Sequence, residues 1–149
     1  MVKVKVKKLN QNVSLPSYKT IGASGMDLKA FLKEPVNVKP NTSSLIPTGL
    51  SVAFSKDYEI QIRPRSGLAA KNNISVLNTP GTIDSDYRGE IKIILFNHGK
   101  IDFTVNNGDR VAQMILSPVV KIELEETNDL PETIRGEGGF GSTGKWNLS

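Results

Sequence analysis

Short apolar or alternating segments recur along the chain, and residues typical of turns separate them. Valines alternate with lysines over residues 2–6, the period of two that places one set of side chains on each face of a strand. Proline and glycine fall mostly between the segments, as in Pro47-Thr48-Gly49. The pattern predicts a mostly β chain folded as a sandwich, jelly roll or barrel. The predicted strands span residues 2–6, 36–38, 44–54, 59–63, 90–96, 101–105 and 110–124.

One short helix is predicted among these strands, over residues 66–72. Leu68, Ala69 and Ala70 favour helix, and the pair Asn72-Asn73 can end it in the left-handed conformation. Beyond residue 126 the chain has few residues that could fill a core. We therefore predict a core domain over residues 1–126 and a flexible, glycine-rich C-terminal arm over residues 127–149, whose backbone can approach a ligand closely.

Composition narrows the class of protein. The chain has 149 residues, of which 38% are hydrophobic and 23% charged, as expected for one globular domain with a real core. It has no cysteine, which excludes a disulfide framework, a thiol nucleophile and a cysteine-ligated zinc. No apolar run approaches the ~20 residues of a membrane-spanning helix, and the first residues lack the apolar centre of a signal peptide. We expect a soluble cytoplasmic protein.

The net charge of +4 is concentrated at one end of the chain. Lys3, Lys5, Lys7 and Lys8 account for all of it, since the other basic side chains equal the 15 acidic ones in number. The favoured interpretation is the solvated face of a half-buried strand, and the alternative is a face that binds a polyanion. Because the rest of the chain is neutral, we expect no nucleic-acid partner.

Several polar segments could carry chemistry, and each has a purely structural alternative. Arg65 and Ser66 follow a predicted strand and open the predicted helix, where they could bind an anion, or serve as a surface charge and a helix cap. Residues 78–90 read as a turn-rich hairpin in which Asp84 could act as a general base or remain a solvated turn residue. Asp27 could be a turn carboxylate, and residues 109–110 a buried Asp–Arg pair.

Two further signals are weaker. Glycines 136, 138 and 141 match the spacing of a dinucleotide-binding loop, but no helix or βαβ unit can follow them, so only a local phosphate-wrapping role survives. His98 is the single histidine, which leaves neither a histidine metal site nor a Ser/His/Asp triad. We expect His98 to be a surface polar residue.

Five segments, taken in order, resemble the five motifs of the homotrimeric dUTP pyrophosphatase (dUTPase) family. The resemblance implies a β jelly-roll subunit with one short helix, assembled as a trimer in which each active site draws on three chains. It implies hydrolysis of dUTP to dUMP and pyrophosphate, which keeps uracil out of DNA and supplies dUMP for thymidylate synthesis. The segments are residues 23–30, 64–71, 81–90, 108–115 and 135–144.

The resemblance also implies a role for each residue around the nucleoside. Asp84 would take the 3′-hydroxyl and deprotonate the water that attacks the α-phosphorus. Tyr87 would pack on the deoxyribose, where a ribose 2′-hydroxyl would clash. Lys92 would lie beside the sugar, where the family often has a hydrophobic side chain. The uracil edge would be read by Asn78, Gly81, Thr82 and Ile83.

The triphosphate would be enclosed by residues from three motifs. Asp27 would support the site and Arg110 would brace it, while Mg²⁺ would be held mainly by phosphate oxygens and waters, with no direct protein ligand. The C-terminal arm would close with Phe140 over the uracil and Arg135 on the γ-phosphate. The remaining phosphate-binding residues implied are Arg65, Ser66, Gly67, Gln113, Gly141, Ser142 and Thr143.

Two alternatives remain. The related dCTP deaminase family shares the jelly-roll trimer but uses a glutamate base, whereas this chain has Asp84-Ser-Asp-Tyr87 and a complete glycine arm. The other alternative, of a different class, is a regulatory module that binds a partner protein and for which hydrolysis is secondary.

Overall fold

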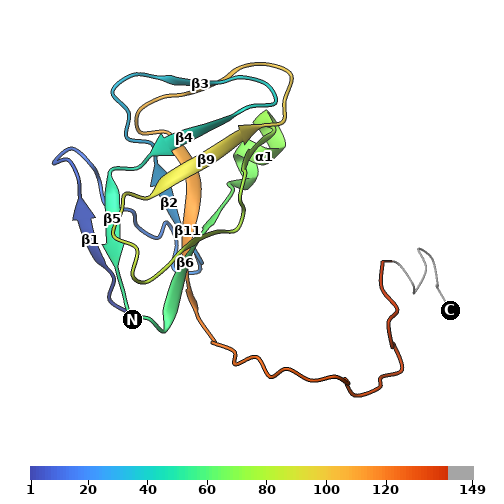
Figure 1. The fold of residues 1–149 in the computed structure, drawn as a ribbon. Helices are drawn as coiled ribbons and strands as arrows, with labels where there is room; N and C mark the ends of the chain where they lie inside the picture. Colours follow the sequence, from blue (N-terminus) through green and yellow to red (C-terminus); the bar gives the residue numbers. More distant parts are fainter. Residues whose placement is uncertain (141–149) are drawn as a thin grey trace.

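A computed structural model describes residues 1–140 and shows a body of short strands with one short helix at its side (Figure 1). The four-stranded sheet has the order β2-β11-β6-β8, and the three-stranded sheet has the order β4-β9-β7. Two further pairs, β1-β5 and β10-β3, complete the body, and every pairing is antiparallel. The strands are β1 (Lys5–Lys8), β2 (Met26–Lys29), β3 (Val36–Val38), β4 (Ser43–Pro47), β5 (Leu50–Ala53), β6 (Tyr58–Arg63), β7 (Ile74–Val76), β8 (Gly81–Ile83), β9 (Lys92–Asn97), β10 (Phe103–Val105) and β11 (Arg110–Pro118).

One aliphatic core joins the two larger sheets. Leu28 on β2 and Ile60 on β6 are fully buried, as are Ile46 on β4 and Leu95 on β9. Alternation explains the burial, because residues 92–97 of β9 switch between the core and the other face at every position. Each such aliphatic side chain stabilises the fold by about 1.5–3 kcal/mol. The all-β jelly-roll prediction with one short helix is confirmed.

The N-terminal strand has the predicted two-faced character but not the predicted bounds. It spans residues 5–8 and pairs with β5, rather than spanning residues 2–6. Val4 and Val6 pack against the core, whereas Val2 is exposed, and Lys5 and Lys7 point to solvent. The lysines therefore form the solvated face of a half-buried strand, as the favoured interpretation had it.

Other strand predictions were wrong in length. The predicted strand over residues 44–54 is interrupted at Thr48-Gly49, where Gly49 adopts φ +70° and divides β4 from β5. The predicted strand over residues 110–124 ends at Pro118, because proline has no backbone N–H to donate to the hydrogen bonds of the sheet. The strands β2, β7 and β8, each of three or four residues, were not predicted.

The helix α1 (Ser66–Asn72) has the predicted bounds. Asn73 ends it in the left-handed conformation at φ 57°, and its backbone N–H donates to the carbonyls of Leu68 and Ala69. Ser66 is the first helical residue, so it is not the cap; that position belongs to Arg65, which has no side-chain capping bond. None of the helical residues is buried, and Leu68 is the residue that packs against the core.

Beyond Pro118 the chain leaves the body and runs outward without regular secondary structure as far as residue 140 (Figure 1). The first residue of this extension, Val119, still donates its backbone N–H to the Asp57 carbonyl at 2.8 Å. The division into a core of residues 1–126 and an arm of residues 127–149 stays a prediction.

Within residues 1–140, no helix has the length and apolar character needed to span a membrane.

Replacing Leu95 by alanine should lower the free energy of unfolding by about 2–5 kcal/mol, because its side chain is fully buried in β9. Chemical denaturation at a fixed protein concentration measures the effect. Leu45→Ala is the matched control, since Leu45 is 55% exposed on the neighbouring strand. Equal losses in the two variants would contradict the assignment of the core.

Candidate active site

Strand register aligns polar residues across the four-stranded sheet. Gln113 on β11 lies opposite Asp27 on β2 and opposite Arg63 on β6. Arg65 follows directly after β6, at the start of α1. The antiparallel pairing therefore brings together Asp27, Arg65 and Gln113, three residues that are far apart in the sequence.

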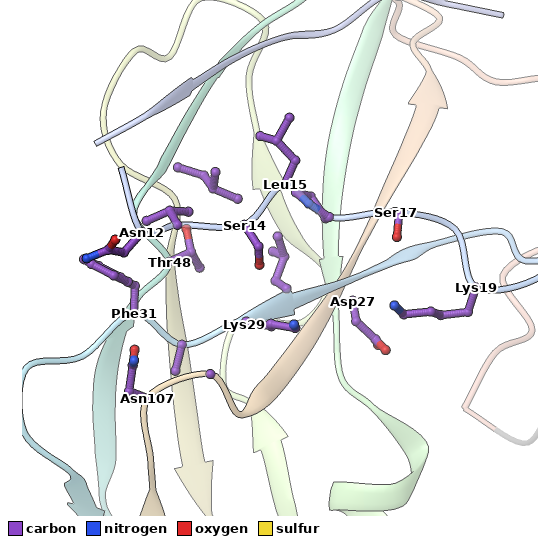
Figure 2. A pocket seen from close by; sticks show the side chains of 16 residues that line it. Asn12, Ser14, Leu15, Ser17, Lys19, Asp27, Lys29, Phe31, Thr48 and Asn107 are labelled. Carbon is purple, nitrogen blue, oxygen red and sulfur yellow. The ribbon is translucent and has the colours of Figure 1, made fainter. Parts of the chain in front are cut away.

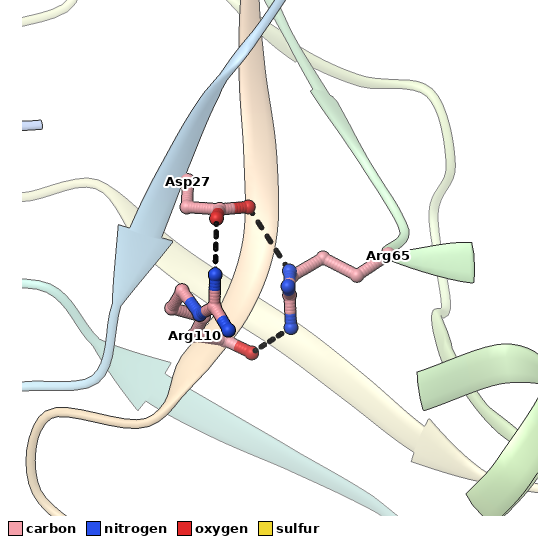
Figure 3. A network of polar contacts seen from close by, with 3 residues as sticks. All are labelled: Asp27, Arg65 and Arg110. Atoms are coloured by element: carbon pink, nitrogen blue, oxygen red, sulfur yellow. Dashed lines mark hydrogen bonds and ion pairs between the residues drawn. The ribbon is translucent and has the colours of Figure 1, made fainter. Parts of the chain in front are cut away.

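The carboxylate of Asp27 binds two arginines (Figure 3). Arg65 Nε donates to Asp27 Oδ1 at 3.0 Å, and Arg110 Nη1 donates to Asp27 Oδ2 at 3.3 Å. Arg65 Nη1 also donates to the Arg110 carbonyl at 3.3 Å. Within residues 1–140, the Nη2 group of Arg65 has no hydrogen-bond partner. A planar guanidinium fixed on one side can still bind an anion on the other.

Two structural alternatives for these residues are wrong. Asp27 lies within β2 rather than in a turn. The partner of Arg110 is Asp27 and not Asp109, whose carboxylate instead accepts the backbone N–H of Asn106 at 2.8 Å. The glycine at the fourth-motif turn, Gly108, has φ +87°, which explains why the chain reverses there before β11.

Ser66 and Gly67 are exposed beside this cluster. A Cβ placed on Gly67 would meet no atom within 4 Å, and its φ is not left-handed. Neither packing nor backbone conformation within residues 1–140 therefore requires glycine at position 67. Close approach of a ligand to the backbone would require it.

A second cluster lines a small pocket of about 30 Å³ at the β8–β9 side of the body. Gly81 is buried there, and a Cβ on it would lie 3.2 Å from Asn78 Nδ2 and 3.3 Å from Ile62 Cβ. The Asn78 amide thus packs against the backbone of Gly81. The pocket brings together the four residues predicted to read the uracil edge, Asn78, Gly81, Thr82 and Ile83, with Lys92, which was predicted to lie beside the sugar.

Asp84 and Tyr87 occupy one tight turn directly after β8. The Tyr87 backbone N–H donates to the Asp84 carbonyl at 3.1 Å. Asp84 is exposed, and its carboxylate accepts no hydrogen bond from residues 1–140. The expected hairpin over residues 78–90 is absent, because the strand in this segment, β8, pairs with β6 instead.

One chain does not bring Asp84 close to Arg65. In the β6–β8 register Ile83 lies opposite Ile60, so Asp84 falls near the start of β6. Arg65 lies beyond the other end of that strand. The stretch from Glu59 to Arg63 alone covers roughly 13 Å at about 3.3 Å per residue. The carboxylate of Asp84 and the guanidinium of Arg65 therefore belong to separate regions of the same subunit.

The described part of the C-terminal arm lies away from the body of strands (Figure 1). Arg135 Nε donates to the Gly138 carbonyl at 2.8 Å, and the Phe140 ring is fully exposed. The other predicted arm residues, Gly141, Ser142 and Thr143, lie outside the described residues.

The larger pocket of the body, about 160 Å³, lies elsewhere, between the N-terminal loop and β2 (Figure 2). Figure 2 shows Lys19 and Lys29 beside it, with Asp27 at one end and Asn107 at the other. Asp27 is the predicted site residue that it shares with the first cluster. Its size does not make it the catalytic pocket, because the other predicted residues lie outside it.

Within residues 1–140, no three His, Cys, Asp or Glu side chains gather closely enough to hold a metal ion. Both oxygens of Asp27 are already engaged by arginines. His98 is a surface residue, as expected, and its Nε2 lies 2.7 Å from the Ser75 hydroxyl.

Sequence reasoning missed residues that hold the Asp84–Tyr87 turn. Arg88 Nη1 donates to the carbonyls of Ser85 and Tyr87, at 2.7 and 2.9 Å. Glu90 Oε1 accepts the backbone N–H of Gly49 at 2.8 Å. The Arg88 contacts reach carbonyls three residues and one residue away, whereas the Glu90 contact spans 41 positions, and neither kind of contact leaves a periodic signal in the sequence.

Comparisons with known proteins point to one family. The model of the dUTPase family matches residues 11–144. A deoxyuridine 5′-triphosphate nucleotidohydrolase of Maricaulis maris is 52% identical over 147 residues, which is 96% of this chain and 97% of the relative. One of Bdellovibrio bacteriovorus is 54% identical over 143 residues, 95% of this chain and 96% of the relative.

Solved structures show the same fold. A mutant dUTPase of Staphylococcus bacteriophage 80alpha, described with dUpNHpp, superposes with a TM-score of 0.86 at 23% identity, over 95% of this chain and 98% of the other. A mutant dUTPase of phage phi11 of S. aureus, described with a structural Mg(II) ion, has a TM-score of 0.78 at 20% identity, over 87% of this chain and 99% of the other.

Replacing Asp27 by asparagine should lower the free energy of unfolding by about 1–3 kcal/mol, because the largely buried Arg65 and the half-exposed Arg110 lose their charged acceptor. Denaturant titration measures the loss. Asp86→Asn, at an exposed turn position, should stay within about 0.5 kcal/mol of the unsubstituted protein. An Asp27→Asn variant as stable as that control would show that the network contributes no net stability.

Proposed function

The chain belongs to the dUTPase family, and from that premise we propose how its residues carry out dUTP hydrolysis. The protein is a hydrolase that acts on dUTP, which the family match over residues 11–144 and relatives above 50% identity support. The observation that carries the proposed mechanism is the exposed, unbonded Asp84 carboxylate on the turn that also presents Tyr87.

The proposed base pocket is the small pocket beside Asn78. Uracil presents one N–H between two carbonyls, which the Asn78 amide and the backbone of Thr82 and Ile83 can match. If backbone of β8 lies this close to the uracil edge, no space is left for a 5-methyl group, which would disfavour dTTP. Cytosine would present a donor where uracil has an acceptor and leave buried groups unpaired.

Asp84 is the proposed general base. Its carboxylate would accept a hydrogen bond from the 3′-hydroxyl and remove a proton from the water that attacks the α-phosphorus. Cleavage of the bond between the α-phosphorus and the oxygen that bridges to the β-phosphorus would then give dUMP and pyrophosphate. An exposed carboxylate with no internal partner is free to accept both hydrogen bonds. The Tyr87 ring, on the same turn, would pack on the deoxyribose and exclude a 2′-hydroxyl.

The triphosphate is proposed to bind the Arg65 cluster. Phosphate oxygens would accept hydrogen bonds from the free Nη2 of Arg65, the Ser66 hydroxyl and the Gln113 amide. The open space at Gly67 would let a phosphate approach the backbone closely. Asp27 orients Arg65 and does not itself touch the substrate.

The substrate is proposed to be the Mg²⁺ complex of dUTP. With Asp27 saturated by arginines, the donor set fits a cation that arrives on the phosphates and keeps its waters, rather than one held by a protein cage. Bound in this way, the cation neutralises phosphate charge. Phe140 and Arg135 are proposed to close the arm over the uracil and the γ-phosphate, together with Gly141, Ser142 and Thr143.

A homotrimer is proposed because one chain separates the carboxylate of Asp84 from the guanidinium of Arg65. Arg65 of one subunit and Asp84 of another would meet at an interface. The extension after Pro118 supports assembly: Val120, Ile122 and Leu124 occupy alternate positions and are 80–89% exposed. Such an apolar stripe on extended backbone favours pairing with a second copy of the chain.

The proposed cellular role is to remove dUTP before uracil enters DNA and to supply dUMP for thymidylate synthesis, in the cytoplasm. No feature of residues 1–140 favours deamination or a regulatory binding role over hydrolysis.

The Asp84→Asn substitution should lower kcat by about 10²–10⁴-fold, because the water loses its base. The affinity for dUpNHpp should change by no more than a few fold, since asparagine keeps a hydrogen-bond acceptor for the sugar. Pyrophosphate release and calorimetric titration measure the two quantities. Asp102→Asn, on an exposed turn before β10, is the control that should keep full activity. Loss of binding with Asp84→Asn would contradict a base role.

Mixing two inactive variants tests the shared site. Asp84→Asn and Arg65→Ala subunits, refolded together in equal amounts, should regain about a quarter of the wild-type activity, because random assembly then builds that share of intact interfaces. Each variant refolded alone should remain inactive. An absence of recovery in mixed oligomers, verified by light scattering, would show that both residues act within one subunit.

A further inference from the structure

The Tyr87 ring lies directly on the backbone of Gly89. A Cβ placed on Gly89 would lie 2.5 Å from the ring atom Cζ and 2.9 Å from Cε2, and closer still to the hydroxyl oxygen. Atoms at such distances overlap, so the ring would have to move. Gly89 does not have a left-handed φ, so its own backbone conformation does not require glycine. The position of the Tyr87 ring does.

The far end of the ring is tethered to the next residue. The Tyr87 hydroxyl donates to the Glu90 carbonyl at 3.0 Å. Glu90 is itself held, because its Oε1 accepts the N–H of the buried Gly49 at 2.8 Å and its Oε2 lies 3.9 Å from Lys92 Nζ. The tether therefore ends on fixed backbone.

The backbone after Glu90 is fixed by buried hydrogen bonds. Ile91 is fully buried, and its N–H donates to the Leu50 carbonyl at 2.8 Å. The Ile91 carbonyl accepts the buried Thr48 hydroxyl at 2.6 Å. The acceptor for Tyr87 is thus anchored to the β4–β5 turn and cannot follow the ring if the ring shifts.

The ring is not held by general crowding. Tyr87 is 43% exposed, so one side of it faces solvent, where a ligand can bind. A half-exposed aromatic ring normally samples several rotamers. Here the backbone of Gly89 on one face of the ring and the hydrogen bond from the Tyr87 hydroxyl to the Glu90 carbonyl define the position of the ring.

We propose that Gly89 and the Glu90 carbonyl form a seat for the Tyr87 ring, and that this seat determines how strongly the enzyme rejects ribonucleotides. The proposal rests on the proposed packing of Tyr87 against the deoxyribose. Steric exclusion of a single 2′-hydroxyl depends on ring position to within about 1 Å, and a displacement of that size can cost about 10²-fold in rate. Gly89 and Glu90 act through Tyr87, as positioning residues.

The test compares dUTP with UTP in the Gly89→Ala variant. The ratio of kcat/KM for dUTP to that for UTP should fall at least about tenfold, because the displaced ring no longer blocks the 2′-hydroxyl. Gly22→Ala is the matched control: a Cβ there meets no atom within 4 Å, and its φ is not left-handed. Its ratio should equal that of the unsubstituted enzyme. An unchanged ratio in Gly89→Ala, or an equal loss on both substrates, would overturn the proposal.

Tyr87→Phe decides the question if Gly89→Ala fails to fold. This variant keeps the ring and removes only the hydrogen bond to the Glu90 carbonyl. The ratio of kcat/KM for dUTP to that for UTP should then fall several-fold, which corresponds to the loss of about one hydrogen bond. An unchanged ratio would count against the seat. Tyr87→Ala separates this proposal from the proposed function. If Tyr87→Ala keeps its discrimination, the sugar-packing role itself is wrong. If Tyr87→Ala loses it while Tyr87→Phe and Gly89→Ala keep it, only the seat is wrong.

Discussion

The antiparallel pairing of β6 with β11 on one side and β8 on the other determines where every proposed functional group lies. The register with β11 places Gln113 in one row with Asp27, and the end of β6 delivers Arg65 to that row. The register with β8 sets Asp84 near the opposite end of the strand. Buried aliphatic side chains such as Ile60 and Ile62 hold this register, because a slip by one residue would turn them to solvent.

Two different kinds of interaction fix the side chains around Asp27 and around Tyr87. Around Asp27 the organisation is electrostatic: one carboxylate binds and aligns two guanidiniums, and its charge offsets part of their mutual repulsion. Around Tyr87 it is steric and backbone-directed, with the absence of a side chain at Gly89 as important as any contact. The division suits the two parts of a nucleotide, since phosphates are recognised by charge and a sugar by shape.

The sequence predicted the β class, the helix and its left-handed end at Asn73, because alternation and turn residues act locally. Through a resemblance to motifs in a known order, it also named residues that the structure brings together, such as Asp27 with Arg65 and Asn78 with Gly81. It did not predict that Arg110 would pair with Asp27 rather than with its neighbour Asp109, or that Glu90 would anchor to Gly49. Those contacts join residues more than forty positions apart, and only the sheet register determines them.

If Asp84 of one subunit meets Arg65 of another, as proposed, their separation within one chain has a genetic consequence. A subunit that folds and assembles but lacks one of these groups removes that group from a site whose other residues belong to normal neighbours. In a cell that makes two defective kinds of subunit, one lacking Asp84 and the other lacking Arg65, mixed oligomers would contain some sites with both groups intact, and the two alleles would complement each other. An allele that destabilises the aliphatic core would complement neither, because its product would never enter an oligomer.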